Sequence, residues 1–170
     1  MSKLYSFALI AAISSIIFIS CSKTTNVVVP VNKGTITGML SNTGSSFSVS
    51  DENVYLTRTY STDSVPVLIY HLNAIISRYP DKVLTLTLKG PLTAQTYGIG
   101  TKKVQALYQI GSAPTDIYTT TSDSSVISGS VNLTTYSIDS LIGNYSVTVT
   151  NTLGNKININ GGSFNCSFVR

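Results

Sequence analysis

Val83-Leu84-Thr85-Leu86-Thr87-Leu88 is the clearest structural signal in the chain. Leucine occupies every second position and threonine the positions between them, so an extended strand has one apolar and one polar face. The same period of two recurs in Tyr145-Ser146-Val147-Thr148-Val149-Thr150, and Phe164, Cys166 and Phe168 share a face. The pattern predicts strands that each bury one face, as in an antiparallel sheet.

Turn signals divide much of the remaining chain into similar short runs. Gly, Pro, Asn and Asp cluster between the apolar stretches, for example at Lys89-Gly90-Pro91; such residues favour turns. Nine or ten short strands at this spacing are typical of an antiparallel β-sandwich or a barrel-like sheet. The predicted strands cover residues 35–40, 47–60 with a break, 65–76, 83–89, 95–99, 104–110, 116–121, 126–136, 142–150 and 156–168 with a turn at Gly161-Gly162.

One segment, Val67–Ser77, fits either a helix or a strand. Its leucines and isoleucines make a helical stripe, and Pro66 before it suits a first helical turn. Its β-branched residues, however, are restricted in a helix and favoured in a strand. We therefore expect a strand here.

The first 21 residues resemble a bacterial lipoprotein signal. Lys3 provides a positive start, Leu4–Ile19 is apolar except for three Ser, and the small Ser20 precedes Cys21. The apolar run is shorter than the ~20 residues of a comfortable membrane span. The resemblance implies cleavage before Cys21 and acylation of its thiol, although Phe18 replaces the usual Leu. The alternatives are an ordinary signal peptide with a coincidental Cys, or a short membrane anchor.

This interpretation divides the chain into a signal peptide (1–20), a lipidated N-terminus and tether (21–33) and a single β domain (34–170). One acyl chain alone attaches a protein only marginally, so durable attachment to a lipid bilayer requires two or three chains on Cys21. Asp after the Cys often signals inner-membrane retention, but Ser22 stands there. We therefore expect a lipid-anchored protein at the outer membrane of a bacterial cell envelope. Cys166 then lacks a disulfide partner and is expected in the core.

The second half of the chain contains an ordered series of strand-like segments: Leu84–Leu88, Gln95–Gly100, Ala106–Gln109, Asp116–Thr120, Ser128–Tyr136, Ile142–Val147 and Gly162–Phe168. Their order, from a Leu-rich strand to a final Gly-x-Phe-Asn strand, resembles a family of small secreted bacterial lipoproteins of unknown function. The resemblance covers about half of the chain. It implies an antiparallel β-fold and an envelope location, and it implies no catalytic residues.

The residues that carry most enzyme chemistry are sparse. His71 is the single His, and its apolar surroundings predict a strand residue with a satisfied hydrogen bond rather than a catalytic base. The 7 Asp and Glu residues lie in or beside predicted turns, so the paired carboxylates of a glycosidase are not expected. We predict no catalytic residue, cofactor site or metal site; a calcium site at Asp51–Asn53 or Asp123–Ser124 is the less favoured alternative.

A binding role fits the composition better. The chain has 10 Tyr, which suit protein or sugar surfaces. Without Lys3 it carries 10 Lys and Arg against 7 Asp and Glu, a net +3 that is too small and scattered for nucleic acid. Lys102-Lys103 is expected in a turn. We expect a non-enzymatic, membrane-anchored envelope lipoprotein with a binding or structural role, whose partners are the bilayer through Cys21 and an envelope protein or glycan. The alternatives are a glycan- or protein-binding module with an exposed Tyr face, and a hydrolase.

Ser64 and Ser140 are candidate sites of sugar attachment. Asp63-Ser64-Val65 and Asp139-Ser140-Leu141 resemble the acceptor of a bacterial periplasmic O-glycosylation system, which is an Asp, then Ser or Thr, then an aliphatic residue. Because Ser and Thr are frequent in this chain, such a match arises easily by chance.

Overall fold

The computed structural model describes residues 32–62, 64–78, 81–120 and 128–168, and within them it contains eleven β-strands. Two single-turn 3-10 helices, η1 (Asp51–Asn53) and η2 (Pro114–Asp116), lie between strands. The predicted all-β, antiparallel fold is confirmed. The strands are β1 (Asn32–Leu40), β2 (Ser45–Ser50), β3 (Val54–Tyr60), β4 (Leu68–Arg78), β5 (Asp81–Lys89), β6 (Thr96–Ile99), β7 (Val104–Ile110), β8 (Ile117–Thr119), β9 (Gly129–Ser137), β10 (Ser140–Thr150) and β11 (Lys156–Phe168).

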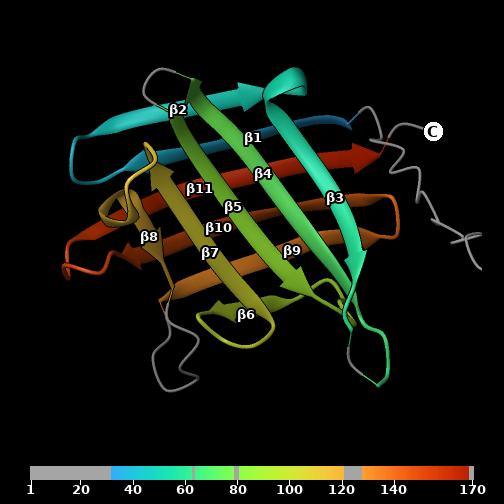
Figure 1. The fold of residues 1–170 in the computed structure, drawn as a ribbon. Helices are drawn as coiled ribbons and strands as arrows, with labels where there is room; N and C mark the ends of the chain where they lie inside the picture. The colour runs from blue at the N-terminus through green and yellow to red at the C-terminus, as the bar shows by residue number, and fades with distance from the viewer. Residues whose placement is uncertain (1–31, 63, 79–80, 121–127, 169–170) are drawn as a thin grey trace, which may run out of the picture.

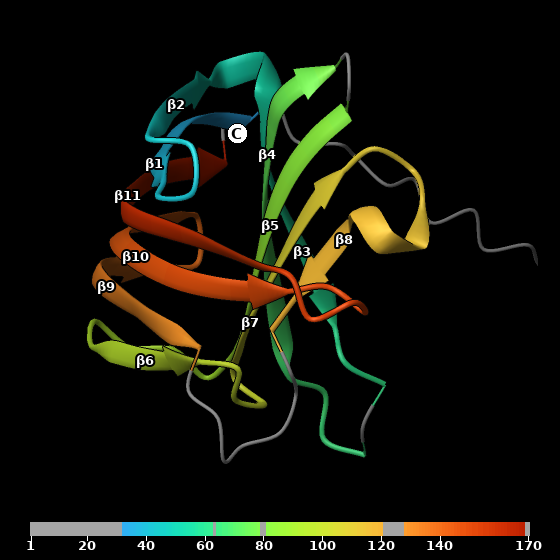
Figure 2. The ribbon, with the colours of Figure 1, turned by 90° about the vertical axis from the view of Figure 1, so that its left-hand side faces the viewer.

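All eleven strands belong to one sheet that is folded into two layers (Figure 1). The order along the sheet is β2-β1-β11-β10-β8-β7-β5-β4-β3, and β9 pairs with both β10 and β6. Figure 2 shows β1, β2, β6, β9, β10 and β11 in one layer and β3, β4, β5, β7 and β8 in the other. β10 meets β8 at one residue pair, Thr150 with Thr119, where the sheet passes between the layers.

The core lies between the layers and is built from alternate residues of the strands. Leu84, Leu86 and Leu88 of β5 have no exposed surface, whereas the threonines between them are partly exposed. Leu86 pairs with Leu72 of β4 on one side and with Ala106 of β7 on the other. Burying a Leu side chain contributes about 1.5–3 kcal/mol to the stability of the fold. The leucines at every second position of β5 therefore stabilise the packing of the two layers.

The ambiguous segment Val67–Ser77 is a strand, as expected. Within β4, Tyr70, Leu72 and Ala74 are buried and the residues between them are half-buried, which is the period of a strand and not of a helix. β4 pairs along its length with β3 and β5. Its β-branched residues therefore lie in the centre of a layer, the environment that suits them.

The described part of the chain has eleven strands, more than the nine or ten expected; the break expected within residues 47–60 is present, but its first strand begins at Ser45. Residues 47–60 form two strands, β2 and β3, which belong to different layers and are separated by η1. In η1, Asp51 has φ 46°, an uncommon backbone conformation for a residue with a side chain. The predicted tether also ends too late, because Asn32 and Lys33 already pair with Phe168 and Ser167 of β11. The β domain therefore includes residues 32 and 33.

The turn predicted at Gly161-Gly162 is also wrong, because β11 continues through it with a β-bulge. The register with β1 and β10 shifts at this point, and Gly161 has φ 57°. Gly162 lies directly under the ring of Tyr145, whose hydroxyl crosses β11 and donates a hydrogen bond of 2.8 Å to the Thr37 carbonyl. These glycines therefore bend a strand and admit an aromatic ring where turn chemistry alone predicts a reversal.

Candidate functional site

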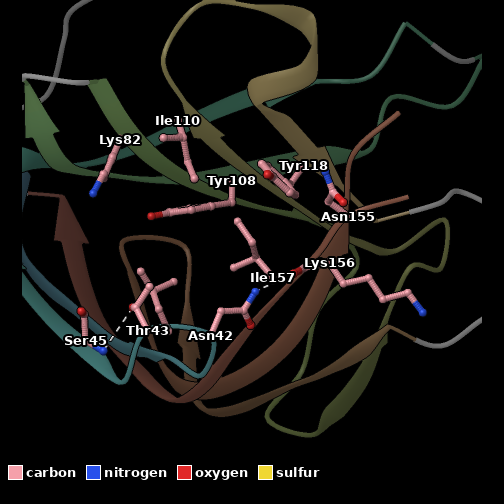
Figure 3. Close-up of a pocket in the computed structure, with 11 residues that line it drawn as sticks. Asn42, Thr43, Ser45, Lys82, Tyr108, Ile110, Tyr118, Asn155, Lys156 and Ile157 are labelled. Carbon is pink, nitrogen blue, oxygen red and sulfur yellow. Dashed lines mark hydrogen bonds between the residues drawn. The ribbon is translucent and has the colours of Figure 1, made fainter. Parts of the chain in front are cut away.

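An open cavity of about 520 Å³ lies at one end of the sandwich, where the core meets solvent (Figure 3). This volume is within the usual range for small-molecule sites. One layer supplies inner-face residues from β5, β7 and β8, and the other supplies the β1–β2 turn and the start of β11. The lining residues are Leu40, Asn42, Thr43, Ser45, Lys82, Tyr108, Ile110, Tyr118, Asn155, Lys156 and Ile157.

Tyr108 is the distinctive member of this set. Alternation along β7 places it on the inner face with Val104 and Ala106, and it is 1% exposed. Among the described residues, its hydroxyl is the one buried side-chain oxygen or nitrogen without a hydrogen-bond partner. Burial, assisted by the nearby phenol of Tyr118, raises the pKa of Tyr108 above its ordinary value. The hydroxyl therefore stays protonated at neutral pH and retains an unused donor.

An unused buried donor in a folded protein requires an explanation. Leaving such a group unpaired costs about 1–3 kcal/mol, because it has lost its water without gaining a protein partner. Figure 3 shows the Tyr108 hydroxyl directed toward the side on which Lys82 stands, and the ring itself lies beneath the cavity surface with 1% of its area exposed. A bound molecule that accepts a hydrogen bond from the Tyr108 hydroxyl would remove this destabilisation.

Hydrogen bonds hold the opposite rim of the cavity in place. The Asn42 side chain donates to the Lys156 carbonyl at 2.7 Å, and the Ser41 amide donates to the Asn158 carbonyl at 3.0 Å. The Asn151 side-chain oxygen accepts from the amides of Leu153 and Asn155. The β1–β2 turn and the start of β11 are thus fixed to each other, and the rim is formed before any ligand arrives.

Removing the Tyr108 hydroxyl should not destabilise the protein. We expect Tyr108→Phe to leave the free energy of unfolding unchanged or to raise it by up to ~1 kcal/mol, since an unpaired buried group disappears. Tyr145→Phe is the matched control: its hydroxyl bonds to the Thr37 carbonyl, and its loss should cost about 1 kcal/mol. Urea denaturation of the full chain measures both. Equal destabilisation by the two variants would mean that the Tyr108 hydroxyl has a partner within the protein.

This cavity is absent from the predictions made from sequence. Lys82 provides the signal that was missed, because it shares the inner face of β5 with Leu84, two residues later. A cation at an inner-face position marks the place where the core opens. Recognising it requires the pairing of Lys82 with Ile110 and of Leu84 with Tyr108, which the sequence pattern does not give.

His71 is a strand residue with satisfied ring nitrogens, as predicted. Nε2 and Nδ1 lie 3.2 Å from the hydroxyl oxygens of Thr59 and Thr87, respectively. Burial lowers the pKa of His71 below its ordinary value. Both nitrogens are thus engaged with the flanking strands, and His71 does not line the cavity.

The described acids lie in or beside turns, also as predicted. Asp51 and Glu52 form part of η1, and Asp116 ends η2. Asp139 lies in the β9–β10 turn, where its Oδ1 is 3.5 Å from Nη1 of Arg58. Within the described ranges, no three His, Cys, Asp or Glu side chains are grouped so that they could hold a metal ion. The calcium candidate Asp123–Ser124 lies outside these ranges.

Cys166 is a fully buried core residue, as its neighbours predict. Burial raises the pKa of its thiol to about 12, so the thiol stays protonated and poorly reactive. Adding a Cβ to the facing Gly34 would bring it within 3.1 Å of the Cys166 sulfur, which indicates tight packing. Cys166 therefore acts as a small apolar side chain.

The candidate modification sites are spread over the chain. Cys21 lies outside the described residues. Ser64 is exposed in the connection between β3 and β4, whereas Ser140 begins β10 and is half-buried beside the fully buried Leu141. Of these two serines, Ser64 is the one that an enzyme can reach more easily. Lys102-Lys103 lies in the turn between β6 and β7, as predicted.

Most tyrosines in the described strands point inward. Tyr60 is 69% exposed, but Tyr70, Tyr97, Tyr108 and Tyr145 are buried. The remaining three are half-buried: Tyr55, Tyr118 and Tyr136. Two pairs of these tyrosines meet: Tyr108 and Tyr118 line the cavity, whereas Tyr70 and Tyr136 make an edge-to-face contact with their ring centroids 5.9 Å apart.

Comparisons with protein families, with curated proteins and with solved structures find no match for this chain. In the described part of the chain, no helix has the length and apolar character needed to cross a membrane.

Proposed function

We propose that the chain is a non-enzymatic, lipid-anchored binding protein of the bacterial envelope, and that its ligand site is the cavity around Tyr108. The pattern of Lys3, Leu4–Ile19, Ser20 and Cys21 supports the anchor. The unpaired Tyr108 hydroxyl and the preformed rim support a binding site. The engagement of His71 by two threonines supports a role without acid–base catalysis.

The arrangement of β1 carries this proposal. Asn32 begins β1 beside β11, and Leu40 ends it at the cavity. Nine residues of strand separate these points by about 26 Å at ~3.3 Å per residue. The chain that leads back to Cys21 therefore enters the domain at the end opposite the cavity. With the acyl chains in the bilayer, the cavity faces away from the membrane and is open to ligands.

Energy transfer from two labelled positions to the membrane tests this orientation. Ile138 is 56% exposed in the β9–β10 turn, at the same end as Lys33, because Ser137, Ser140, Ser167 and Lys33 lie side by side across four strands. Thr43 is exposed on the cavity rim. The acylated full chain, carrying Ile138→Cys or Thr43→Cys with a coumarin label, is incorporated into vesicles that contain rhodamine-headgroup lipid.

We expect more efficient transfer from the label at position 138 than from the label at position 43. The chain without either substitution is the control for labelling, because its buried Cys166 should not react. Equal transfer from both positions, or more from position 43, would contradict the proposed orientation.

A further inference from the structure

Lys82 is an inward-facing cation at the mouth of the cavity. The inner face of β5 consists of Lys82, Leu84, Leu86 and Leu88, and the three leucines have no exposed surface. Lys82 is half-buried and pairs in register with Ile110, beside the pair Leu84 and Tyr108. The ammonium group therefore reaches the cavity from the same layer as Tyr108, whose unused hydroxyl donor lies buried just beneath the cavity surface (Figure 3).

The charged residues that line the cavity are basic. Lys82 and Lys156 line it, and none of its described lining residues is acidic. Asp81, the neighbour of Lys82, belongs instead to a separate hollow that includes Val83 and Gln109. Lys156 points away from the centre of the cavity, so Lys82 is the lysine positioned to meet a ligand (Figure 3).

The remaining lining residues fit a ligand with an apolar body. Leu40, Ile110 and Ile157 provide aliphatic surface from both layers, and Tyr118 adds an aromatic ring. The side-chain amides and the Ser and Thr hydroxyls of the lining set lie along the β1–β2 turn and at Asn155, toward the rim. An apolar group thus finds its contacts inside, and an acidic group finds donors in Tyr108 and Lys82.

We infer that the cavity binds a small carboxylate with an apolar ring or chain, whose carboxylate accepts a hydrogen bond from Tyr108 and pairs with Lys82. This inference rests on the proposed function only in taking the cavity to be the ligand site. A carboxylate can accept the hydrogen bond of the Tyr108 phenol and can also pair with the charge of Lys82. A neutral amide or alcohol can accept the hydrogen bond but cannot pair with the charge. The selectivity for charge should therefore depend on Lys82.

Titration calorimetry with paired probes tests the inference. The acylated full chain in detergent is titrated at pH 7.5 with 1-naphthylacetate, 4-phenylbutyrate and octanoate, and with the primary amide of each. Protein-free micelles supply the blank. Lys82→Gln, Tyr108→Phe and Lys156→Gln are titrated in parallel, after urea denaturation shows that each is folded.

At least one carboxylate should bind the unsubstituted chain about tenfold more tightly than its amide, since a hydrogen bond to a charged group is worth that much or more. Lys82→Gln should remove this tenfold preference and leave amide binding unchanged. Tyr108→Phe should weaken both members of the pair, and Lys156→Gln should change affinity less than threefold.

Two results would overturn the inference: no carboxylate outcompeting its amide, or an equal loss from Lys82→Gln and Lys156→Gln. Because binding is measured in detergent solution, its failure leaves the anchor and orientation unaffected. Conversely, failure of the vesicle experiment leaves the ligand assignment unaffected.

Discussion

Gly162→Ala is expected to lower the free energy of unfolding by about 3 kcal/mol. A Cβ at this position would overlap the Tyr145 ring, so the ring must move and its hydrogen bond to the Thr37 carbonyl must break. Overpacking a core costs about 1–3 kcal/mol, and a lost hydrogen bond adds about 1 kcal/mol. Urea denaturation of the full chain, with the slope checked for two-state behaviour, measures the change.

Gly161→Ala separates the effect of packing from that of backbone conformation. A Cβ at Gly161 would meet no atom within 4 Å, but its φ of 57° makes any side chain costly by about 1–2 kcal/mol. In a Tyr145→Leu background, Gly162→Ala should cost less than 1 kcal/mol more, because the ring that it displaces is already gone. If Gly162→Ala costs no more than Gly161→Ala in the unsubstituted chain, the packing argument fails.

Two other glycines in this layer also lie against an aromatic ring that leaves no room for a Cβ. A Cβ at Gly38 would overlap the Phe47 ring, and one at Gly143 would lie 2.8 Å from the ring of Phe164. Gly38, Gly162 and Gly143 belong to β1, β11 and β10, which are adjacent in the sheet. Aromatic rings thus cover glycines across three neighbouring strands, and this part of the core tolerates little added volume.

Cys21→Ser should move the protein from the membrane fraction to the soluble fraction or leave it with an uncut leader. Each buried CH₂ group contributes about 0.8 kcal/mol to membrane attachment. Without the two or three acyl chains, we therefore expect nearly all of the attachment to be lost. Fractionation of cells grown with an alkynyl fatty acid reports attachment and acylation together. The substituted chain should carry no fatty-acid label.

Cys166→Ser is the matched control, since it removes the other cysteine of the chain. Cys166 is fully buried and its thiol has a raised pKa, so it should accept no acyl chain. We expect this variant to stay labelled and membrane-bound. A Cys21→Ser chain that still incorporates label and stays on the membrane would show that the anchor is elsewhere.

The strands could be predicted because their signal is local. Alternation in Val83–Leu88 and in Tyr145–Thr150 requires only neighbouring residues, and both segments are strands with the expected faces buried. Cys166 and His71 also have the environments that their neighbours in the sequence predict. For each of these residues, the flanking apolar residues determine the environment.

The errors arise where distant strands decide the outcome. Gly161-Gly162 has the composition of a turn, but pairing with β1 and β10 on either side holds it in a continuous strand. Lys82 reads as an ordinary surface lysine until its register with β7 is known. Tyr108 likewise reads as one of several strand tyrosines, and only the packed structure shows that its hydroxyl lacks a partner.

The attachment of the domain to a membrane is the claim on which the proposed orientation and role depend. Trypsin cleaves after Lys23, so mass spectrometry of the purified native protein isolates a short N-terminal peptide. We expect the tripeptide Cys21-Ser22-Lys23, with a diacylglyceryl group on the thiol and the mass of two or three acyl chains in total. Recovery of unmodified Leu4–Lys23, with the leader still joined to Cys21, would contradict this expectation.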